Sequence, residues 1–321
     1  MLTVLANMDG EVRKVDGIDP AWLAPDSKVT FWVDLAAPTP HESAILRNPF
    51  HFHELAIEDS LAESHHPKVE SYGTFLYVIL HGIDFEAAKH RFATHDTDFF
   101  VGPNYLVTVH DGTSRSIASM REVCERNEHV LSKGPVELLH RIVDAMIDNY
   151  LPEVEKLSDR LEQLEHRVFE EPNESLVKPI LGLKRDVASL RRVLLPQRDV
   201  VGRLARREFS VITEAMSYRF RDVYDHLVRL TDESMLFHDR LSSLLDAHLT
   251  SVSTHLNQVM KVLTVIATIF MPLTVLTGMW GMNVPIPAFP GGDAMQFWWV
   301  VALMAVTTGA MLWLFRLRRW M

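Results

Sequence analysis

The sequence predicts an α/β domain at the N-terminus, followed by long α-helices that lead into a hairpin of two membrane-spanning helices. Three observations support this fold class. Strand-like and short helical segments alternate in residues 1–134, and from residue 135 apolar residues recur every three or four positions. The stretch Val262–Phe315 contains one charged residue, Asp293. A chain of 321 residues is long enough for more than one domain.

Residues 1–134 are expected to form a mixed α/β domain. The segments Lys28–Leu35 and Thr74–Ile83 are rich in β-branched and aromatic residues, which favour strands. Two further strand-like runs flank residues 102–104, and because Gly, Pro and Asn each favour turns, this pair is a hairpin candidate. Residues 38–63 are interrupted by prolines and are expected to form short helical pieces.

Residues 135–212 are expected to form long antiparallel helices. Apolar residues in two segments follow steps of three and four, which place them on one face of a helix. Glu170–Ser175 has the composition of a turn and separates these segments. The two apolar stripes comprise Leu157, Leu161, Leu164 and Val168 in the first segment, and Leu183, Val187, Leu190 and Leu194 in the second.

A third helix is expected to run from water into a membrane. Neither Gly nor Pro occurs between Gly202 and Pro272, which allows a helix of about 60–70 residues, on the order of 100 Å long. Residues 213–258 are rich in charges and would form a stalk in water. Residues 259–280 and 294–315 are apolar, and each is long enough to cross a bilayer, which needs about 20 residues.

The flanking charges predict the orientation of this hairpin. Lys261 directly precedes the uncharged run Val262–Trp280 of the first span, and Arg316 and Arg318 belong to the basic tail of residues 316–321. The connecting loop, residues 281–293, contains neither Lys nor Arg. By the positive-inside rule, both termini face the cytoplasm and the loop lies outside. We therefore expect a multi-pass protein of the cell's inner (plasma) membrane, with the lipid bilayer as its surroundings.

The overall composition disfavours two classes of function. The chain has 42 acidic and 32 basic residues and a net charge of −10, whereas nucleic-acid-binding domains usually carry a clustered positive surface. We expect no nucleic-acid partner. A Gly-rich phosphate loop, a nucleophile elbow and an HExxH motif are all missing from the sequence, so we expect no enzyme.

The first span carries a candidate lining for a polar path. Two helices cannot enclose a pore, so several copies of the chain would have to surround an axis. Polar and bulky apolar residues recur at three- and four-residue steps on one face and would contact water or gate it. Alternatively, the threonines bond back to their own helix. The recurring positions are Asn257, Met260, Leu263 or Thr264, Thr268 or Ala267, Met271, Thr274 and Gly278.

The loop after the first span offers uncharged oxygen ligands. Gly281 allows the chain to leave the helix, and the Asn283 side chain both donates and accepts hydrogen bonds. A ring of such amides and backbone carbonyls would match the water shell of a strongly hydrated cation. Mg²⁺ releases its waters reluctantly, so this loop, at the outer end of the predicted path, is suited to bind a hydrated ion.

These residues resemble the CorA family of magnesium transporters. The most specific feature is NQVMKVLTVIATIFMPLT, Asn257–Thr274, followed by Gly-Met-Asn at residues 281–283. The similarity covers nearly the whole chain. It includes FRDVYDHLVRLTD at Phe220–Asp232, LKRDVASLRRVLLP at Leu183–Pro196, HFHELAIEDSLAESHHPKVE at His51–Glu70 and GPNYLVTVH at Gly102–His110.

The resemblance implies a funnel-shaped homopentameric channel. Its cargo would be Mg²⁺, with Co²⁺ or Ni²⁺ as further cargo, entering the cell down its electrochemical gradient. By the family pattern, Gly281, Met282 and Asn283 form the outer ion-selecting ring, and Asp246 forms an acidic ring at the inner mouth. The implied pore-lining residues are Asn257, Met260, Leu263, Met271 and Thr274.

The resemblance also implies regulatory Mg²⁺ between neighbouring protomers. The matching carboxylates are Asp59 and Asp222, with Glu58 adjacent. A divalent ion between them would hold the subunits together and the pore closed. Loss of this ion would let like charges repel and loosen the ring.

Other functions stay open at this stage. Val284 and Trp280 differ from the residues that magnesium-transporting members carry at these positions. They resemble the related ZntB-type zinc transporters, which would imply Zn²⁺ as cargo and proton coupling. Met282, in contrast, favours magnesium as cargo.

Four histidines suggest a separate zinc site, because HFH in an extended segment would place both rings on one side. A membrane-anchored coiled-coil scaffold that conducts nothing is a further alternative. These histidines are His51, His53, His65 and His66.

Overall fold

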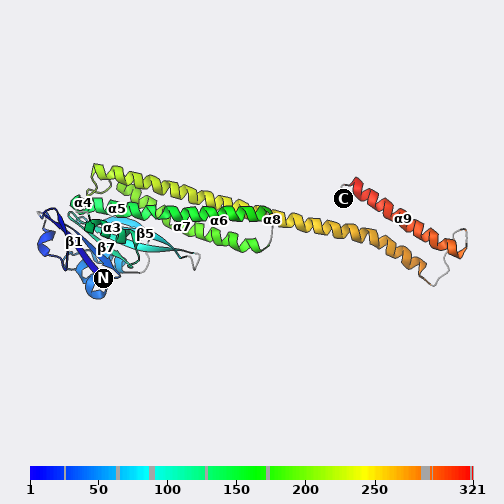
Figure 1. The fold of residues 1–321 in the computed structure, drawn as a ribbon, viewed down its shortest axis with the longest axis horizontal. Coiled ribbons are helices and arrows are strands. Elements are labelled where there is room, and N and C mark those ends of the chain that lie inside the picture. The colour runs from blue at the N-terminus through cyan, green and yellow to red at the C-terminus, as the bar shows by residue number, and fades with distance from the viewer. Residues whose placement is uncertain are drawn as a thin grey trace. The chain divides into compact units, whose positions relative to one another are not determined.

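The computed structural model contains two compact units (Figure 1). It describes residues 1–321 except 25–26, 63–65, 87–90, 127–128, 171–173, 283–289, 291, 319 and 321. The first unit comprises Met1–Glu170 and Ser175–Leu244. The second comprises Glu171–Glu174 and Leu245–Met321.

The first unit contains a seven-stranded sheet in the order β2-β1-β3-β7-β6-β5-β4. Neighbouring strands are antiparallel except β3 and β7, which are parallel. The predicted strands are confirmed as β3, β5 and the β6–β7 hairpin, whereas β1, β2 and β4 are not among the strands expected from the sequence. The bounds are β1 Leu2–Met8, β2 Glu11–Val15, β3 Thr30–Ala36, β4 Lys68–Ser71, β5 Leu76–Glu86, β6 Arg91–Val101 and β7 Tyr105–His110.

Short helices cover one face of this sheet with an aromatic core. They are η1 (Pro20–Leu23), α1 (Pro40–Ser43), η2 (Ala44–Leu46) and α2 (Glu54–Leu61). The last three confirm the short helical pieces predicted for residues 38–63, whereas η1 was not predicted. Phe50 and Phe52 stack on each other with ring centroids 5.0 Å apart, and Phe52 stacks on Phe100 of β6 at 4.3 Å. Alternate strand residues therefore fasten α2 to the sheet.

Helix α5 (Pro135–Asp148) packs against β3, β5, β6 and β7. Helix α4 (His129–Ser132) packs against β1 and β3, and α3 (Arg115–Arg126) packs against β2 and α5. Buried polar groups on this side satisfy one another. Trp32 Nε1 donates to Thr108 Oγ1 at 3.0 Å, and Thr108 Oγ1 donates to Asp34 at 2.7 Å.

The long helices of the first unit lie side by side (Figure 1). They are α6 (Tyr150–Glu170), α7 (Val177–Ala205), which follows the short η3 (Glu174–Leu176), and the first part of α8 (Glu214–Trp280). Both predicted apolar stripes are buried, so these helices are confirmed. Polar contacts join them in pairs: Arg160 to Asp186 at 2.8 Å, Lys184 to Ser242 at 3.0 Å and Arg240 to Glu165 at 2.7 Å.

Helix α8 begins at Glu214, well after Gly202, and ends at Trp280, beyond Pro272. Its bounds are therefore shifted relative to the stretch without Gly and Pro. Residues 206–213 join α7 to α8, and Arg207 there adopts a left-handed φ of 58°. The helix has 67 residues and continues through Pro272 to Trp280. The predicted divisions of the chain at residues 134, 212 and 258 stay predictions.

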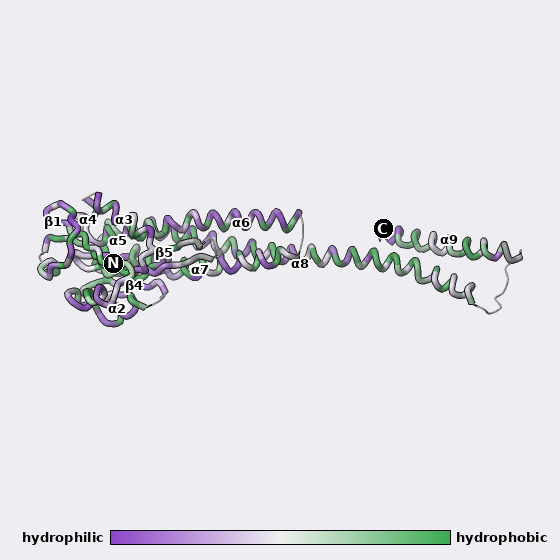
Figure 2. Tube along the Cα trace, turned by 60° about the horizontal axis from the view of Figure 1, so that its bottom comes forward, coloured by the Kyte–Doolittle hydropathy of each residue, from purple (hydrophilic) through white to green (hydrophobic). Residues whose placement is uncertain are grey.

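The second unit contains the apolar end of α8 and α9 (Asp293–Leu317), as expected from the sequence. Both helices are long and apolar enough to cross a membrane. Figure 2 shows hydrophobic residues on all sides of these segments, whereas the helices of the first unit alternate in hydropathy. Their side chains are largely exposed in a single chain, so lipid or other copies must cover them.

A buried carboxylate ties α5 to α8. Glu137 is 5% exposed and accepts hydrogen bonds from Arg141 Nε at 3.1 Å and from Arg219 Nη1 at 2.6 Å. Burial raises the pKa of Glu137, but the hydrogen bonds and charges of Arg141 and Arg219 outweigh it and lower the pKa overall. A carboxylate with a lowered pKa stabilises the fold where the unfolded chain would be deprotonated.

We expect Glu137→Gln to lower the free energy of unfolding near pH 7 by about 1–3 kcal/mol, because it removes a charged acceptor from two arginines. This contribution is fully present above the unfolded pKa, about 4.5, and is lost as the pH falls through the lower folded pKa. Urea titrations of the full-length protein in detergent, near neutral pH and near pH 4, would measure it. Glu122→Gln, at an exposed position, is the control. If the free energies of unfolding of Glu137→Gln and the unaltered protein differ by the same amount at low pH as near pH 7, this account is contradicted.

Candidate functional site

The predicted pore-lining residues lie on one face of α8. At 3.6 residues per turn, Asn257, Met260, Leu263, Met271 and Thr274 fall within an arc of roughly 120°. All are exposed in a single chain, and Met260, Leu263 and Met271 are 65%, 64% and 69% exposed. Asp246 lies within the same arc and is exposed too. The pore-lining role of these residues stays a prediction.

The threonines of the first span do bond back to their own helix. The hydroxyls of Thr264, Thr268 and Thr274 each donate to the carbonyl oxygen four residues earlier, at 2.8, 2.7 and 2.9 Å. This confirms the alternative geometry for the hydroxyl protons. Each oxygen keeps its acceptor lone pairs, so a threonine on this face offers acceptor capacity only.

The predicted outer mouth is only partly described. Helix α8 ends at Trp280, and the Gly281 N–H donates to the Thr277 carbonyl at 2.9 Å, so Gly281 follows the last turn as predicted. Met282 is 58% exposed. Asn283 and Val284 lie outside the described residues.

The predicted regulatory residues lie on two different elements of the first unit. Asp59 and Glu58 belong to α2, and Asp222 is an exposed residue of α8. Asp59 accepts a hydrogen bond from Lys68 Nζ at 2.5 Å. Glu58 and Asp222 are therefore exposed at the surface of a single chain, whereas Asp59 is half-buried and paired with Lys68.

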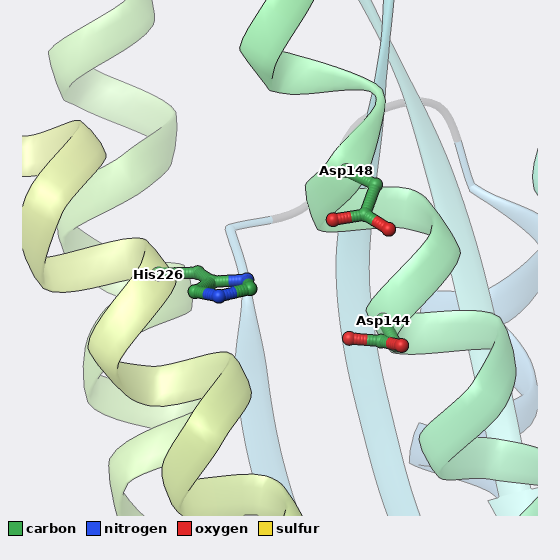
Figure 3. Close-up of side chains that lie close together, drawn as sticks. All are labelled: Asp144, Asp148 and His226. Carbon is green, nitrogen blue, oxygen red and sulfur yellow. The ribbon is translucent and has the colours of Figure 1, made fainter.

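Three further residues form a cluster next to Asp222 that the sequence analysis did not identify. Asp144 and Asp148 of α5 and His226 of α8 each place a carboxylate oxygen or ring nitrogen within 4.8 Å of the others. Figure 3 shows the two carboxylates and the imidazole facing one another across the two helices. Asp144 and Asp148 are one helical turn apart, as are Asp222 and His226, so each pair shares one helix face.

The charges of this cluster favour a cation. Partial desolvation raises the pKa of Asp148, and the negative charges of Asp144 and then Asp222 raise it further, although His226 opposes them. A carboxylate with a raised pKa is destabilised in its ionised form, and a bound cation would relieve that repulsion. Carboxylate oxygens suit Mg²⁺, and an imidazole nitrogen adds a ligand that Co²⁺, Ni²⁺ or Zn²⁺ accepts.

The predicted separate histidine site has a different geometry. The HFH segment is not extended as expected, because His51 adopts a left-handed φ of 52°. His53 caps α2, where its Nδ1 accepts from the Leu55 N–H at 3.2 Å. His66 is exposed, and His65 lies outside the described residues. Among the residues that the structure does describe, the α5–α8 cluster is the set of three ligating side chains that lie close enough to share an ion.

Comparisons with known proteins agree with this arrangement. The family model described as "CorA-like Mg2+ transporter protein" matches residues 27–319. The cobalt/magnesium transport protein CorA of Thermotoga maritima is 31% identical over 304 residues, which cover 92% of this chain and 85% of that protein. The zinc transport protein ZntB of Cronobacter sakazakii is 31% identical over 191 residues, 57% of each chain.

A solved structure shows the same fold. The complete structure of the CorA magnesium transporter from Methanocaldococcus jannaschii superimposes with a TM-score of 0.83 at 25% identity, covering 98% of this chain and 97% of that one. It matches both the N-terminal α/β domain and the long helix that leads into the two apolar C-terminal helices. The chain therefore belongs to the CorA-like Mg²⁺ transporter family, a family of transporters rather than enzymes, and is a divalent cation transporter of the CorA/ZntB type.

Proposed function

We propose that this protein is a homopentameric channel that admits Mg²⁺ into the cell. The first spans of neighbouring protomers would surround the axis, and Co²⁺ and Ni²⁺ would be further cargo. The observation that supports this most is that one face of α8 carries Asn257 and Thr274 among Met and Leu residues. On a membrane helix, the Asn257 amide needs hydrogen-bond partners that lipid does not provide.

Acceptor groups on this face suit a hydrated cation. Water molecules around a cation point their hydrogens outward, so the wall of the path must accept hydrogen bonds. Thr274 has already given its hydroxyl proton to the Phe270 carbonyl and can only accept. Met260, Leu263 and Met271 of all protomers would each form an apolar ring around the path. When the path narrows, these apolar rings would exclude water and so close it.

The membrane potential would drive entry. An inside-negative potential of 100 mV is worth about 2.3 kcal/mol per elementary charge, so a divalent ion gains about twice that. Asp246, on the same face of α8 toward the stalk, would attract the ion at the inner mouth. Gly281, Met282 and Asn283 would select it at the outer mouth through uncharged oxygens.

Regulation would come from the α5–α8 cluster together with α2 of a neighbouring protomer. Asp222, Asp144, Asp148 and His226 would supply one side of a cytoplasmic Mg²⁺ site. Asp59 and Glu58 of the adjacent subunit would supply the other. The bound ion would join two subunits and keep the path closed, and its loss at low internal Mg²⁺ would let them separate.

Zinc transport is the second candidate. The similarity to the Cronobacter sakazakii zinc transporter supports it, as does His226, since imidazole is a better ligand for Zn²⁺ than for Mg²⁺. A proton-coupled mechanism would then need a pH gradient. A scaffold that conducts nothing is the third candidate, and it predicts no uptake of any cation.

We expect Asn283→Ala to reduce Mg²⁺ uptake by at least tenfold, because it removes the outer amide ring. Uptake into liposomes that contain the purified protein, under an inside-negative potential, would measure the rate. Gln296→Ala, which removes an amide from α9 instead, is the control and is expected to transport normally. Unchanged uptake by Asn283→Ala would favour the scaffold.

We also expect the double variant Asp144→Asn/Asp148→Asn to need about tenfold more Mg²⁺ on the cytoplasmic side for half-inhibition of uptake. The reason is that two carboxylates of the inhibitory site lose their charge. Asp159→Asn, at an exposed position of α6, is the matched control. Inhibition at the same Mg²⁺ concentration as in the unaltered protein would exclude this cluster from regulation.

A further inference from the structure

Lys68 forms an ion pair with the carboxylate of Asp59. Its Nζ lies 2.5 Å from Asp59 Oδ2, and this pair joins the beginning of β4 to α2. The two side chains are only 31% and 23% exposed, so solvent screens them less than it would a pair on the open surface. Asp59 therefore already has a counterion, although it is an expected ligand of a divalent cation.

Lys68 also has a second partner within reach. Its Nζ lies 3.1 Å from Glu70 Oε2, and the Tyr72 hydroxyl donates to the same oxygen at 3.0 Å. The ammonium stands 5.5 Å from the centroid of the Tyr77 ring, which also favours a cation there. If Asp59 turned to another cation, Lys68 would keep Glu70 and the aromatic ring and would not be left unpaired.

A groove of about 740 Å³ runs beside the edge strand β4. Its lining residues include Lys68, Glu70 and Tyr72 of the β4 region and Asp199 and Arg203 of α7. Arg203 is held there by the Val69 carbonyl at 2.9 Å. The Lys68 ammonium lies near the Tyr77 ring, with Asp59 and Glu70 as its ion-pair partners at this open edge of the sheet.

Electrostatics decides the effect of this lysine on a metal at Asp59. An ammonium group and a divalent cation at the same carboxylate repel each other, so the metal must either displace Lys68 or bind beside it at a cost. In both cases the occupancy of the metal site begins at a higher cation concentration than it would without the lysine. When no divalent cation is bound at Asp59, Lys68 would also neutralise this carboxylate and so limit the electrostatic repulsion between subunits.

We propose that Lys68 is a tethered counterion that competes with the divalent cation for Asp59. It thereby sets the cation concentration at which the regulatory site fills. This inference rests on the proposed regulatory role of Asp59. The Mg²⁺ concentration that half-fills the site thus depends on how strongly the Lys68 ammonium binds Asp59.

The test is the Mg²⁺ concentration that produces half of the rise in unfolding temperature of the full-length protein in detergent. We expect Lys68→Met, which keeps the apolar stem but removes the charge, to lower this concentration about three- to tenfold. Lys68→Arg keeps the charge and should stay near the unaltered protein. Lys133→Met, at an exposed position of the first unit, should do the same.

A double variant separates direct competition from a general change of charge. In the Asp59→Asn background, Lys68→Met should have no further effect, since the shared carboxylate is gone. Equal half-maximal concentrations in Lys68→Met and the unaltered protein would overturn the role of Lys68 alone. An unaltered protein whose unfolding temperature does not respond to Mg²⁺ would overturn the proposed regulatory site, and the role of Lys68 with it.

Discussion

The hydrocarbon core of a bilayer offers no water, and this constraint governs the apolar end of α8 and helix α9. The apolar side chains of α8 and α9 satisfy it by facing lipid, and their backbone groups satisfy it by forming helices. The Asn257 amide does not suit lipid, whereas the Thr274 hydroxyl donates to a carbonyl of its own helix. Since two helices cannot enclose a water-filled path, the proposed path would need the same face of other copies opposite this one. Assembly around an axis is therefore part of the proposed function itself.

The first unit carries the residues of the proposed regulatory cation site on packed helices. Glu137 joins α5 to α8 through Arg219, so the helix that carries Asp144 and Asp148 is held against the helix that carries His226. Asp59 lies on α2, packed on the opposite face of the sheet by stacked phenylalanines. Both sets of ligands thus sit on well-packed elements. A cation shared by neighbouring protomers would act on rigid bodies, and α8 continues from the first set into the predicted pore.

The sequence predicted those features that repeat along one element. The apolar stripes of α6 and α7 and the exposed face of α8 follow from helical periodicity alone. Strands β2 and β4 were not recognised because they are short edge strands whose charged residues hide any alternation. Strand β1 is buried on both faces and its residues show no regular alternation of apolar and polar side chains, so periodicity does not distinguish it from a buried helix. The α5–α8 cluster was missed because its two halves are far apart in the chain, although the four-residue spacing within each half was visible. The role of Asn283 in the outer ring was predicted from the Gly-Met-Asn motif, and Asn283 lies outside the residues that the structure describes.

The most direct test of the central claim is the accessibility of α8 residues to water during transport. With the one native thiol removed by Cys124→Ser, Met271→Cys would place a thiol on the predicted pore face. Ile269→Cys would place one about 160° away around the same helix. A water-soluble thiol reagent is predicted to block Mg²⁺ uptake through the Met271→Cys protein in liposomes and to leave the Ile269→Cys protein active. Block of the Ile269→Cys protein alone, or of neither, would contradict the account.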